Sequence, residues 1–476
     1  MRSPFRRAAA LGAGLALGTA FTSSNAVAQK PVAPTAAQAV PTLDAPPIPP
    51  TPPPIDDPQL APPPAPPMVL KSWEDALAMV RAQSPDFRRR YDNILRAEAQ
   101  TRVALAALLP TASAQGTFTH QFFTNALVPV GDGTTANVAV LPENAFGLTA
   151  EATWTLVDFR AYHALRTSKL AVGAAQMDLA DERRTIAESV VTTMLGTLAA
   201  ERVAELNRVG LRAALERLSL AQAKTKYGGG TELDLDRANQ DVAAARALVI
   251  SGDEALLEAR EALGVALGSR VAIGGPGSID LEQFESTVAS TCKLNPDLEK
   301  RADVQAAIRR VTLAKRAVDD VWLSFAPTLA LGSALGWSSE PIEVPGTTWS
   351  VGATINVPIW DGGARYGNLR DARAAADQAE QTLASVRLRE VVDVERASRA
   401  VGVTKASRDV AQQQRDLAKR VDERTRQGYM HGLGTSLDLV VSAQALRQTE
   451  INLALLQFQA AQARVLAILA NADCAY

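Results

Sequence analysis

The chain has 476 residues, enough for more than one domain of ordinary size. Its formal net charge of −2 leaves no bulk positive field, so we expect no nucleic-acid partner. Aromatic residues make up only 5% of the sequence, which is low for a globular enzyme with a large mixed core. Abundant Ala, Leu, Gln, Arg and Glu instead favour long helices that pack closely.

Residues 1–28 have the pattern of a secretory signal peptide. Three arginines precede an apolar run over residues 8–21, and Ala26-Val27-Ala28 is a small-residue cleavage site. An N-terminal membrane anchor is the alternative, but the apolar run is too short to span a bilayer. No later segment has about 20 uninterrupted apolar residues. Any membrane crossing must therefore use β-strands.

Residues 29–70 are dominated by proline and are expected to form a disordered, extended tether. A segment of this composition cannot bury a core of its own. A plain linker is the simpler interpretation, and a ligand for a partner domain is the alternative.

The remaining chain divides into two repeats, over residues 71–268 and 295–476, joined by a linker over 269–294. Each repeat is predicted to contain a helix, two strands, a very long helix, a glycine-containing break and a second helix. The long helices are expected over about 160–226 and 364–427, each about 100 Å long at 1.5 Å per residue. Helices of that length cannot belong to a compact domain and indicate coiled-coil rods. The shared plan indicates a tandem duplication.

Four segments alternate apolar and polar residues with a period of two, beginning near Thr111, Phe146, Thr328 and Thr348. The last is expected to continue to Trp360. In the third segment leucines and Trp337 share one face, while small and polar residues share the other. This pattern is typical of transmembrane β-strands with lipid on one side and water on the other, and a soluble sandwich is the alternative.

Four strands cannot close a barrel, and an open sheet edge is not tolerated in lipid. Several chains must therefore share one barrel. Periodicity alone does not choose between eight, twelve or sixteen strands, from two, three or four chains.

Several short motifs occur in a fixed order in the second repeat. They are Asn295-Pro296-Asp297-Leu298, Phe325-Ala326-Pro327, Pro358-Ile359-Trp360-Asp361-Gly362-Gly363, and Gln427-Gly428-Tyr429 continuing to Leu439. Their types and spacings resemble those of the TolC-like outer membrane efflux protein family. The resemblance covers about residues 72–470. It is weaker in the first repeat, where Leu156-Val157-Asp158-Phe159 replaces the Asp-Gly-Gly motif.

This resemblance implies a mixed α and β membrane protein, with four transmembrane strands per chain in a shared trimeric barrel above long periplasmic helices. It implies a homotrimer in contact with outer-membrane lipid, a periplasmic adaptor protein and an inner-membrane pump. The implied function is a passive conduit for efflux or type I secretion across periplasm and outer membrane, without cofactors or enzymatic activity. A periplasmic adaptor, which has one hairpin rather than two, and a structural coiled-coil rod are the alternatives. The cargo is not indicated.

By the same resemblance, the periplasmic tip is expected to hold a gate made by Tyr429, Gly432 and Asp438. Asp234 holds the matching place in the first repeat. When Tyr227 is aligned with Tyr429, the first tip is about two residues shorter than the second. The alternative role for both aspartates is stabilisation of a helix N-terminus. Pro358, Asp361, Gly362 and Gly363 are expected at the junction of barrel and helix.

In the family fold, Cys292 and Cys474 would both lie in the equatorial belt, and we predict a disulfide between them, with two free thiols as the alternative. No catalytic, cofactor-binding or metal-binding residues are predicted. The three histidines, His120, His163 and His431, have no partners at metal-ligand spacing.

Overall fold

The structure is a computed structural model that describes residues 57–122, 125–131, 134–139, 143–277, 280–294, 297–339, 346–470 and 472–474. The predicted signal peptide and residues 29–56 of the predicted tether lie outside the described residues. All described residues belong to a single unit.

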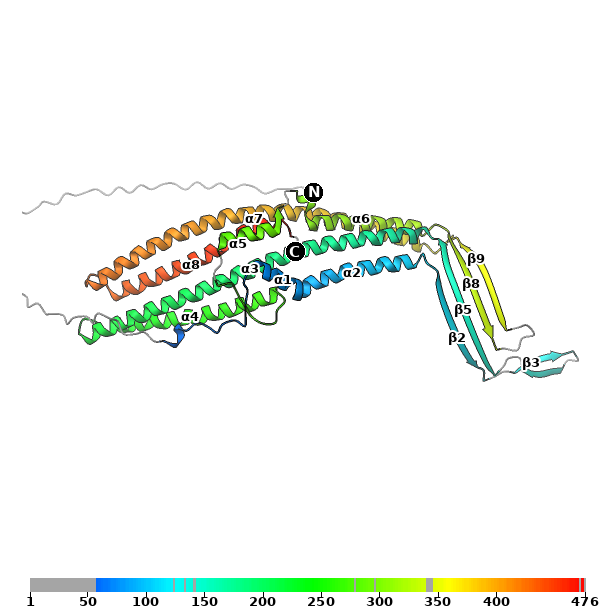
Figure 1. Ribbon diagram of the computed structural model, residues 1–476, viewed down its shortest axis with the longest axis horizontal. Coiled ribbons are helices and arrows are strands. Elements are labelled where there is room, and N and C mark those ends of the chain that lie inside the picture. The colour runs from blue at the N-terminus through cyan, green and yellow to red at the C-terminus, as the bar shows by residue number, and fades with distance from the viewer. Residues whose placement is uncertain are drawn as a thin grey trace, which may run out of the picture. The chain divides into compact units, whose positions relative to one another are not determined.

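The two repeats have the same order of elements (Figure 1). The first contains α1 Trp73–Gln83, α2 Pro85–Ala106, β2 Thr111–His120, β5 Asn144–Val157, α3 Phe159–Lys226 and α4 Glu232–Ala266. The second contains α6 Ala302–Leu323, β8 Thr328–Ser338, β9 Thr347–Asn356, α7 Ala364–Met430 and α8 Ser436–Leu469. The long helices α3 and α7 have 68 and 67 residues. Their near-identical lengths agree with the predicted duplication.

Helix ends differ from prediction where a local signal was overlooked. The single first helix expected in repeat 1 is two helices, because Pro85 starts α2 and the Ser84 hydroxyl caps it. In repeat 2 the expected helix from residue 295 begins instead at Ala302, after a 3-10 turn, η2 Leu298–Lys300. The helix α7 continues three residues beyond its predicted end.

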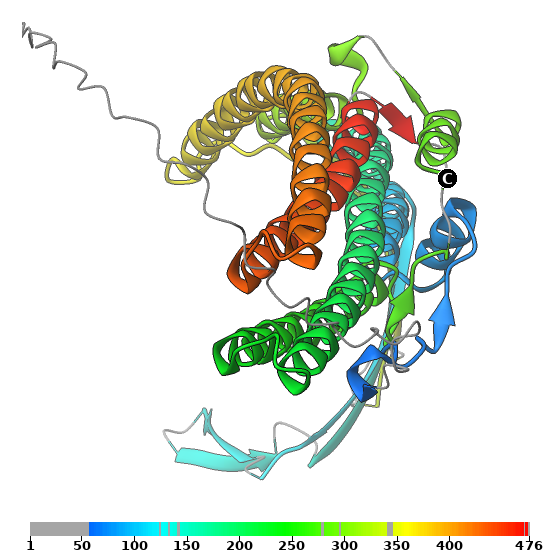
Figure 2. The same cartoon turned by 90° about the vertical axis from the view of Figure 1, so that its left-hand side faces the viewer.

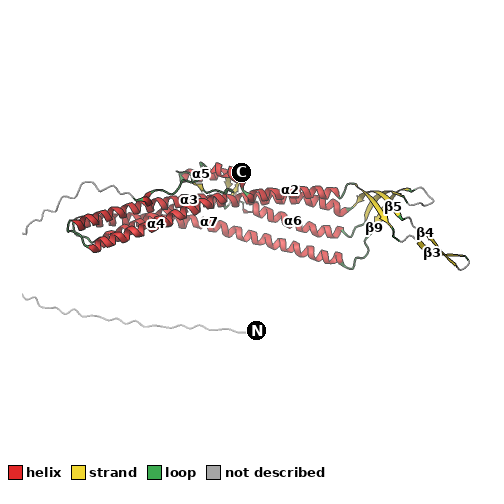
Figure 3. Ribbon diagram, turned by 90° about the horizontal axis from the view of Figure 1, so that it is seen from below, coloured by secondary structure: helices red, strands yellow, loops and turns green. Residues whose placement is uncertain are grey.

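The long helices form two hairpins, α3 with α4 and α7 with α8, that lie side by side (Figure 2). The shorter helices extend the bundle towards the strands: α2 packs on α3, and α6 packs on both α3 and α7. In Figure 3 all the long helices extend from the strands in the same direction, and the loops at the hairpin tips lie at the end of the helices farthest from the strands. The tips and the sheet are therefore separated by the full length of the long helices.

Helix α8 is long and apolar enough to cross a membrane, with a mean hydropathy of 1.2 in its most apolar window. It is nevertheless one arm of a hairpin, packed against α7, α3 and α5 Leu281–Thr291. We therefore assign it to the helical bundle.

The main hydrophobic core lies at the middle of the bundle, where short elements from both repeats meet. Its largest fully buried side chains include Val80 of α1, Met194 of α3, Leu263 of α4 and Leu469 of α8. Two small sheets close this region. One is a parallel pair of β1 Met68–Val69 with β6 Ile273–Gly274, and the other an antiparallel pair of β7 Cys292–Leu294 with β10 Ala472–Cys474.

The four long strands form one antiparallel sheet in the order β2-β5-β8-β9. The central pair, β5 with β8, joins the two repeats. A further hairpin, β3 Asn125–Val130 with β4 Thr134–Ala139, lies between β2 and β5 in sequence and was not predicted. The strand β9 ends at Asn356, four residues before the predicted end at Trp360.

The end of the proline-rich segment differs from the predicted tether, because residues 57–69 lie along the first hairpin. Asp57 forms an ion pair with Arg246 of α4 at 2.8 Å. The carbonyl oxygens of Ala61 and Pro64 accept hydrogen bonds from Arg208 and Arg260, both at 3.2 Å. Three helix arginines thus hold a segment whose regular structure before β1 is one 3-10 turn, η1 Pro58–Leu60.

Candidate barrel strands, junctions and periplasmic tip

The strand register places the apolar residues of all four strands on one face. Leu331 of β8, for example, is paired with Trp154 of β5 and Ala353 of β9. The same face carries Ala112, Ala114, Phe118, Phe146, Leu148, Ala150, Leu329, Leu335, Trp337, Trp349, Val351 and Ile355. Many of these side chains are exposed, including Trp349 at 75% and Val351 at 67%. An apolar face this extensive is a surface for lipid or for another protein.

The opposite face is polar or small. It carries Thr111, Ser113, Gln115, Thr117, Thr149, Glu151, Thr153, Ala330, Gly332, Ala334, Thr348, Ser350, Gly352 and Thr354. Both faces agree residue by residue with the alternation in the sequence. A sheet with one apolar face and one polar face is the arrangement found in membrane β-barrels, where the polar face contacts water.

The junction of β9 and α7 is organised by Asp361. Its carboxylate accepts hydrogen bonds from the backbone N–H groups of Gly363 at 3.1 Å and Arg365 at 3.0 Å. Arg365 donates back to Asp361 at 2.8 Å and to the carbonyl oxygen of Pro358 at 3.1 Å. Gly362 and Gly363 have φ angles of 70° and 89°, a region that favours glycine. All four predicted junction residues thus lie in one turn.

The first repeat makes the same junction with different residues. Asp158 is the N-cap of α3 and accepts a hydrogen bond from the N–H of Ala161 at 3.0 Å. The backbone there is extended, so no glycine is required. This explains why the Asp-Gly-Gly motif is absent from the first repeat.

The two periplasmic tips have the same length, so the prediction of a shortened first tip is wrong. Each long helix ends with a glycine in the left-handed region, Gly228 with φ 77° and Gly432 with φ 76°. In each case the next N–H bonds back to a carbonyl in the last turn, Gly229 to Lys224 and Leu433 to Gly428. In each tip the N-cap threonine of the next helix, Thr231 or Thr435, then follows three residues after the glycine. The structural counterpart of Tyr227 is therefore His431, not Tyr429.

Both predicted gate aspartates belong to capping boxes. The carboxylate of Asp234 accepts from the Thr231 N–H and hydroxyl at 3.1 and 2.9 Å, and that of Asp438 from the Thr435 groups at 3.1 and 2.7 Å. These hydrogen bonds from Thr435 hold the pKa of Asp438 below its ordinary value. Asp438 is exposed and ionised at neutral pH.

Asp234 also joins the two hairpins at their tips. Its second oxygen accepts a hydrogen bond from the Ser436 hydroxyl, and the same hydroxyl accepts from Arg237 at 3.2 Å. The hydrogen bond from Ser436, followed by those from Thr231, lowers the pKa of Asp234. Both oxygens of Asp234 thus accept hydrogen bonds within one chain, whereas the Thr435 groups bond only to Oδ2 of Asp438.

Tyr429 provides a second contact between the tips. It is 8% exposed, and Lys224 of α3 lies 3.7 Å from its ring centroid. Lys224 also donates to the carbonyl oxygen of Tyr429 at 3.4 Å. Burial, followed by the nearby charge of Asp234, raises the pKa of the Tyr429 hydroxyl. Sequence reasoning singled out Tyr429 but missed Lys224, because a lone lysine at a helix end gives no signal of an aromatic partner.

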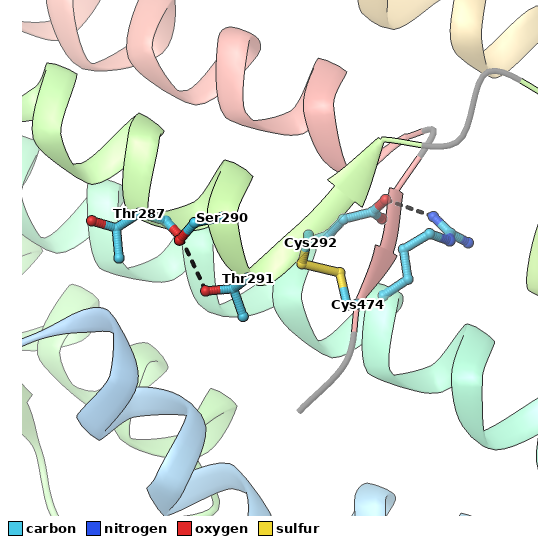
Figure 4. Close-up of a disulfide and its surroundings, with 7 residues drawn as sticks. Thr287, Ser290, Thr291, Cys292 and Cys474 are labelled. Atoms are coloured by element: carbon cyan, nitrogen blue, oxygen red, sulfur yellow. Dashed lines mark hydrogen bonds and ion pairs between the residues drawn. A yellow bond between two sulfur atoms is a disulfide. The ribbon is translucent and has the colours of Figure 1, made fainter.

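A disulfide joins Cys292 and Cys474 across the small equatorial sheet (Figure 4). The two half-cystines are 0% and 1% exposed and belong to the main core. The bridge connects the end of the linker that precedes repeat 2 to β10, 182 positions later in the chain.

A buried carboxylate, Glu390 of α7, lies close to this region. It is 2% exposed, and its Oε1 is 3.8 Å from Nε of Arg301. Arg301 is already hydrogen-bonded to Asp303 at 2.9 and 3.0 Å and to the carbonyl oxygen of Ala470 at 3.0 Å. Burial raises the pKa of Glu390 to about 7, with Arg301 opposing and Asp303 adding to the rise.

The raised pKa of Glu390 predicts a loss of stability as pH rises from acid to neutral. The folded chain holds this proton more tightly than the unfolded chain, whose carboxyl has a pKa of about 4.3. The contribution of the Glu390 carboxyl to the free energy of unfolding is fully present below a pH of about 4.3. It is lost as pH rises through about 7. The variant Glu390→Gln should therefore unfold at a higher temperature than the parent at pH 8 and at a similar temperature at pH 4.5. Parallel melting curves over this range would contradict the assignment.

No described cluster of His, Cys, Asp and Glu could hold a metal ion. His163 does have a carboxylate partner, because its Nδ1 lies 2.6 Å from Oδ1 of Asp320 of α6. This pair ties α3 to α6.

Comparison with protein-family models matches the family described as outer membrane efflux protein, over residues 76–269 and 295–469. The chain belongs to this family. The two matched ranges are the two structural repeats, and the break between them contains the equatorial linker. The predicted family, the mixed α and β fold and the outer-membrane location are confirmed.

Among curated proteins, the efflux protein is 24% identical to the pyoverdine export outer membrane protein OpmQ of Pseudomonas putida, over 61% of this chain and 63% of that one. It is 24% identical to the fusaric acid resistance protein FusA of Burkholderia cepacia, over 64% and 58% of the two chains. The chain thus matches about three fifths of the length of each relative.

Several solved structures share the fold, and two of them are described here by their similarity to this chain. CusC has a TM-score of 0.70 at 17% identity, over 83% of this chain and 91% of that one. The Campylobacter jejuni CmeC outer membrane channel has a TM-score of 0.68 at 17% identity, over 83% and 84%.

Proposed function

We propose that the protein is a passive outer-membrane conduit for efflux or type I secretion, assembled as a homotrimer and without enzymatic activity. The observation that carries this proposal is the four-stranded sheet with an exposed apolar face, placed at one end of helices about 100 Å long. That arrangement combines a membrane-spanning part with a rod long enough to extend into the periplasm.

Closure of the barrel follows from the order of strands. The edges of the sheet are β2 and β9, which run in opposite directions. The β9 edge of one chain can therefore pair with the β2 edge of the next in the same antiparallel pattern. Such pairing removes the open edges, which lipid does not tolerate, and three chains give twelve strands.

The two tips form the proposed periplasmic gate and the surface for an adaptor protein that links the conduit to an inner-membrane pump. In a trimer the tip loops occur six times around one axis, and each contains a left-handed glycine followed by a capping threonine. Three copies of exposed Asp438 would form a ring of negative charge, which favours cations over anions.

Two measurements on the purified protein test the proposed function. A trimer that resists detergent and dissociates on heating should be seen on gels, and reconstituted protein should form channels in planar bilayers. An adaptor or a structural rod would give neither result. A monomeric protein without channel activity would reject the conduit.

The variant Asp438→Asn tests the gate. If Asp438 lines the pore, the variant should weaken cation selectivity and block by multivalent cations, while helix capping changes by only about 0.3–1 kcal/mol. Thr435→Ser is the matched control, because it keeps both the cap and the charge. Unchanged selectivity in intact trimers would leave Asp438 with its capping role alone.

A further inference from the structure

A proline-rich segment, residues 57–66, lies along the α3–α4 hairpin, and we call it the strap. The arginines that contact the strap are Arg208 of α3 and Arg246 and Arg260 of α4. Ala61 has φ −66° and ψ 138°, close to the polyproline II conformation. Because that conformation has three residues per turn, the carbonyl oxygens of Ala61 and Pro64 point to the same side, and each accepts a hydrogen bond from an arginine. Two of the three arginines therefore bind the strap through its backbone.

The strap also matches the hairpin in length. Arg246 and Arg260 lie fourteen positions apart on α4, about 21 Å at 1.5 Å per residue. One 3-10 turn followed by extended backbone carries the strap from Asp57 to Pro64, about 18 Å. Arginine side chains are long enough to cover the difference. Asp57 lies nearer the hairpin tip than Pro64 does, so the strap enters from the tip side.

The hairpin itself orients two of the arginines. Arg208 donates to the carbonyl oxygen of Ala204 at 3.1 Å and forms an ion pair with Asp253 of α4. Arg260 forms an ion pair with Glu201 of α3 at 3.2 Å. The donors that meet the strap are thus held by helix partners whether or not the strap is bound. A site with donors already oriented loses little conformational freedom when its ligand binds.

Two side chains of the strap add specific contacts. Leu60 packs against the buried apolar cluster between α3 and α4, which consists of Leu211, Ala214, Val242, Ala245 and Val249. Asp57 is 8% exposed, and its carboxylate accepts hydrogen bonds from Arg246 at 2.8 Å and from the N–H of Gln59 at 2.9 Å. We call the three arginines and this apolar cluster the strap site. It recognises an acidic residue, then a leucine, then the carbonyl groups of an extended chain.

The second hairpin lacks such a site. When the two hairpins are aligned on the left-handed glycines of their tips, the counterparts of Arg208, Arg246 and Arg260 are Gln412, Glu450 and Arg464. Gln412 bonds to Asp416 of its own helix, and Arg464 forms an ion pair with Glu285 of α5 at 2.7 Å. Glu450 would repel an acidic peptide. The strap site is therefore a property of the first hairpin alone.

We propose that the α3–α4 hairpin carries a preorganised binding site for an extended, proline-rich peptide that begins with an acidic residue, and that the chain fills this site with its own strap. The strap thereby anchors the chain that precedes it to the tip half of the first hairpin. Asp57 lies level with Arg246, fourteen positions from the start of α4 and about 21 Å from the tip. The inference goes beyond the proposed function and does not depend on conduction.

The test is binding of a synthetic peptide in trans. The probe is a dye-labelled peptide of residues 57–67, titrated by fluorescence anisotropy against the purified full-length protein in detergent. A variant with Asp57→Ala and Leu60→Asp should release its own strap and bind the probe saturably. The parent should bind it at least about tenfold more weakly, because its linked strap competes at an effective concentration of about millimolar. A probe carrying the same two substitutions should not bind.

A charge reversal shows whether the probe occupies the strap site. Adding Arg246→Glu to the release variant should weaken binding about tenfold or more, since a charge-assisted hydrogen bond is replaced by repulsion. A probe with Asp57→Lys should recover affinity for that protein. Glu450→Gln, on the matching face of the second hairpin, is the control and should change nothing. Equal binding to parent and release variant, or no recovery with the reversed probe, would overturn the proposal.

A second measurement leaves the strap sequence intact, and it decides if the release variant fails to assemble. Spin labels at exposed positions Ala61 of the strap and Glu232 of α4 lie about 30 Å apart along the hairpin, and labelled chains are diluted with unlabelled ones. The distance distribution should be narrow in the parent and in Glu450→Gln, and should broaden in Arg246→Glu. A distribution that is broad in the parent, or unchanged in Arg246→Glu, would reject the anchoring role.

Discussion

Replacing Cys292 and Cys474 together by alanine should lower the free energy of unfolding by about 2–5 kcal/mol and reduce the yield of assembled protein. The bridge closes a loop of 182 positions, and the entropy that a cross-link removes from the unfolded chain grows with loop length. It also holds β10 on the main core, where both half-cystines are almost fully buried. Thermal unfolding in detergent would measure the loss.

Alanine is chosen because serine would place a hydroxyl among apolar side chains and add a separate cost. The parent protein under strong reductant is the matched control, and its melting temperature should fall to that of the double variant. Thiol labelling of the denatured, non-reduced parent should find no free cysteine. Two labelled cysteines per chain, with equal melting temperatures for parent and variant, would contradict the bridge.

The sequence predicts best the features that depend on long periodic patterns of residues. A strand that alternates over ten residues has only two ways to face, so the apolar face that carries Leu331 and Val351 could be assigned before any pairing was known. The duplication was equally clear, because helices of 68 and 67 residues leave little freedom in their alignment. In both cases many weak signals point to the same arrangement.

Single-residue signals were less reliable, and the tips show why. Tyr227 and Tyr429 look equivalent in the sequence, but a helix end is defined by the left-handed glycine and the capping threonine that follow. Gly228 with Thr231 and Gly432 with Thr435 have identical spacing, which makes the tips the same length. The alignment on tyrosine therefore failed, whereas an alignment on the caps would have succeeded.

Apart from the disulfide between Cys292 and Cys474, which the family resemblance implied, contacts between residues far apart in the chain were not predicted. Asp241 of α4 and Gln444 of α8 are hydrogen-bonded across a separation of 203 positions, and neither stands in a recognisable motif. The binding of residues 57–69 to three helix arginines was missed for a similar reason. A proline-rich segment cannot form a hydrophobic core of its own. Its composition nevertheless allows it to bind in an extended conformation along a helical hairpin.

An arginine on the apolar face of the sheet should prevent assembly, and Val351→Arg is the sharpest case. Val351 lies in the middle of β9 and is 67% exposed in the single chain. If that face contacts lipid, arginine near the midplane should cost about 2–4 kcal/mol and reduce the amount of assembled trimer. Leu331→Arg should behave similarly on β8. Heat-modifiable trimer in outer-membrane fractions is the measurement.

The neighbouring residue on the same strand supplies the control. Gly352 faces the opposite side, and no atom lies within 4 Å of a Cβ built there, so Gly352→Arg adds the same charge to open space. Ala330→Arg is the equivalent control for Leu331→Arg, because the two positions alternate along β8. The control variants should assemble as the parent does. Equal loss of trimer from both faces would show that the charge disturbs the sheet itself, and the assignment of a lipid face and a water-filled lumen would then be wrong.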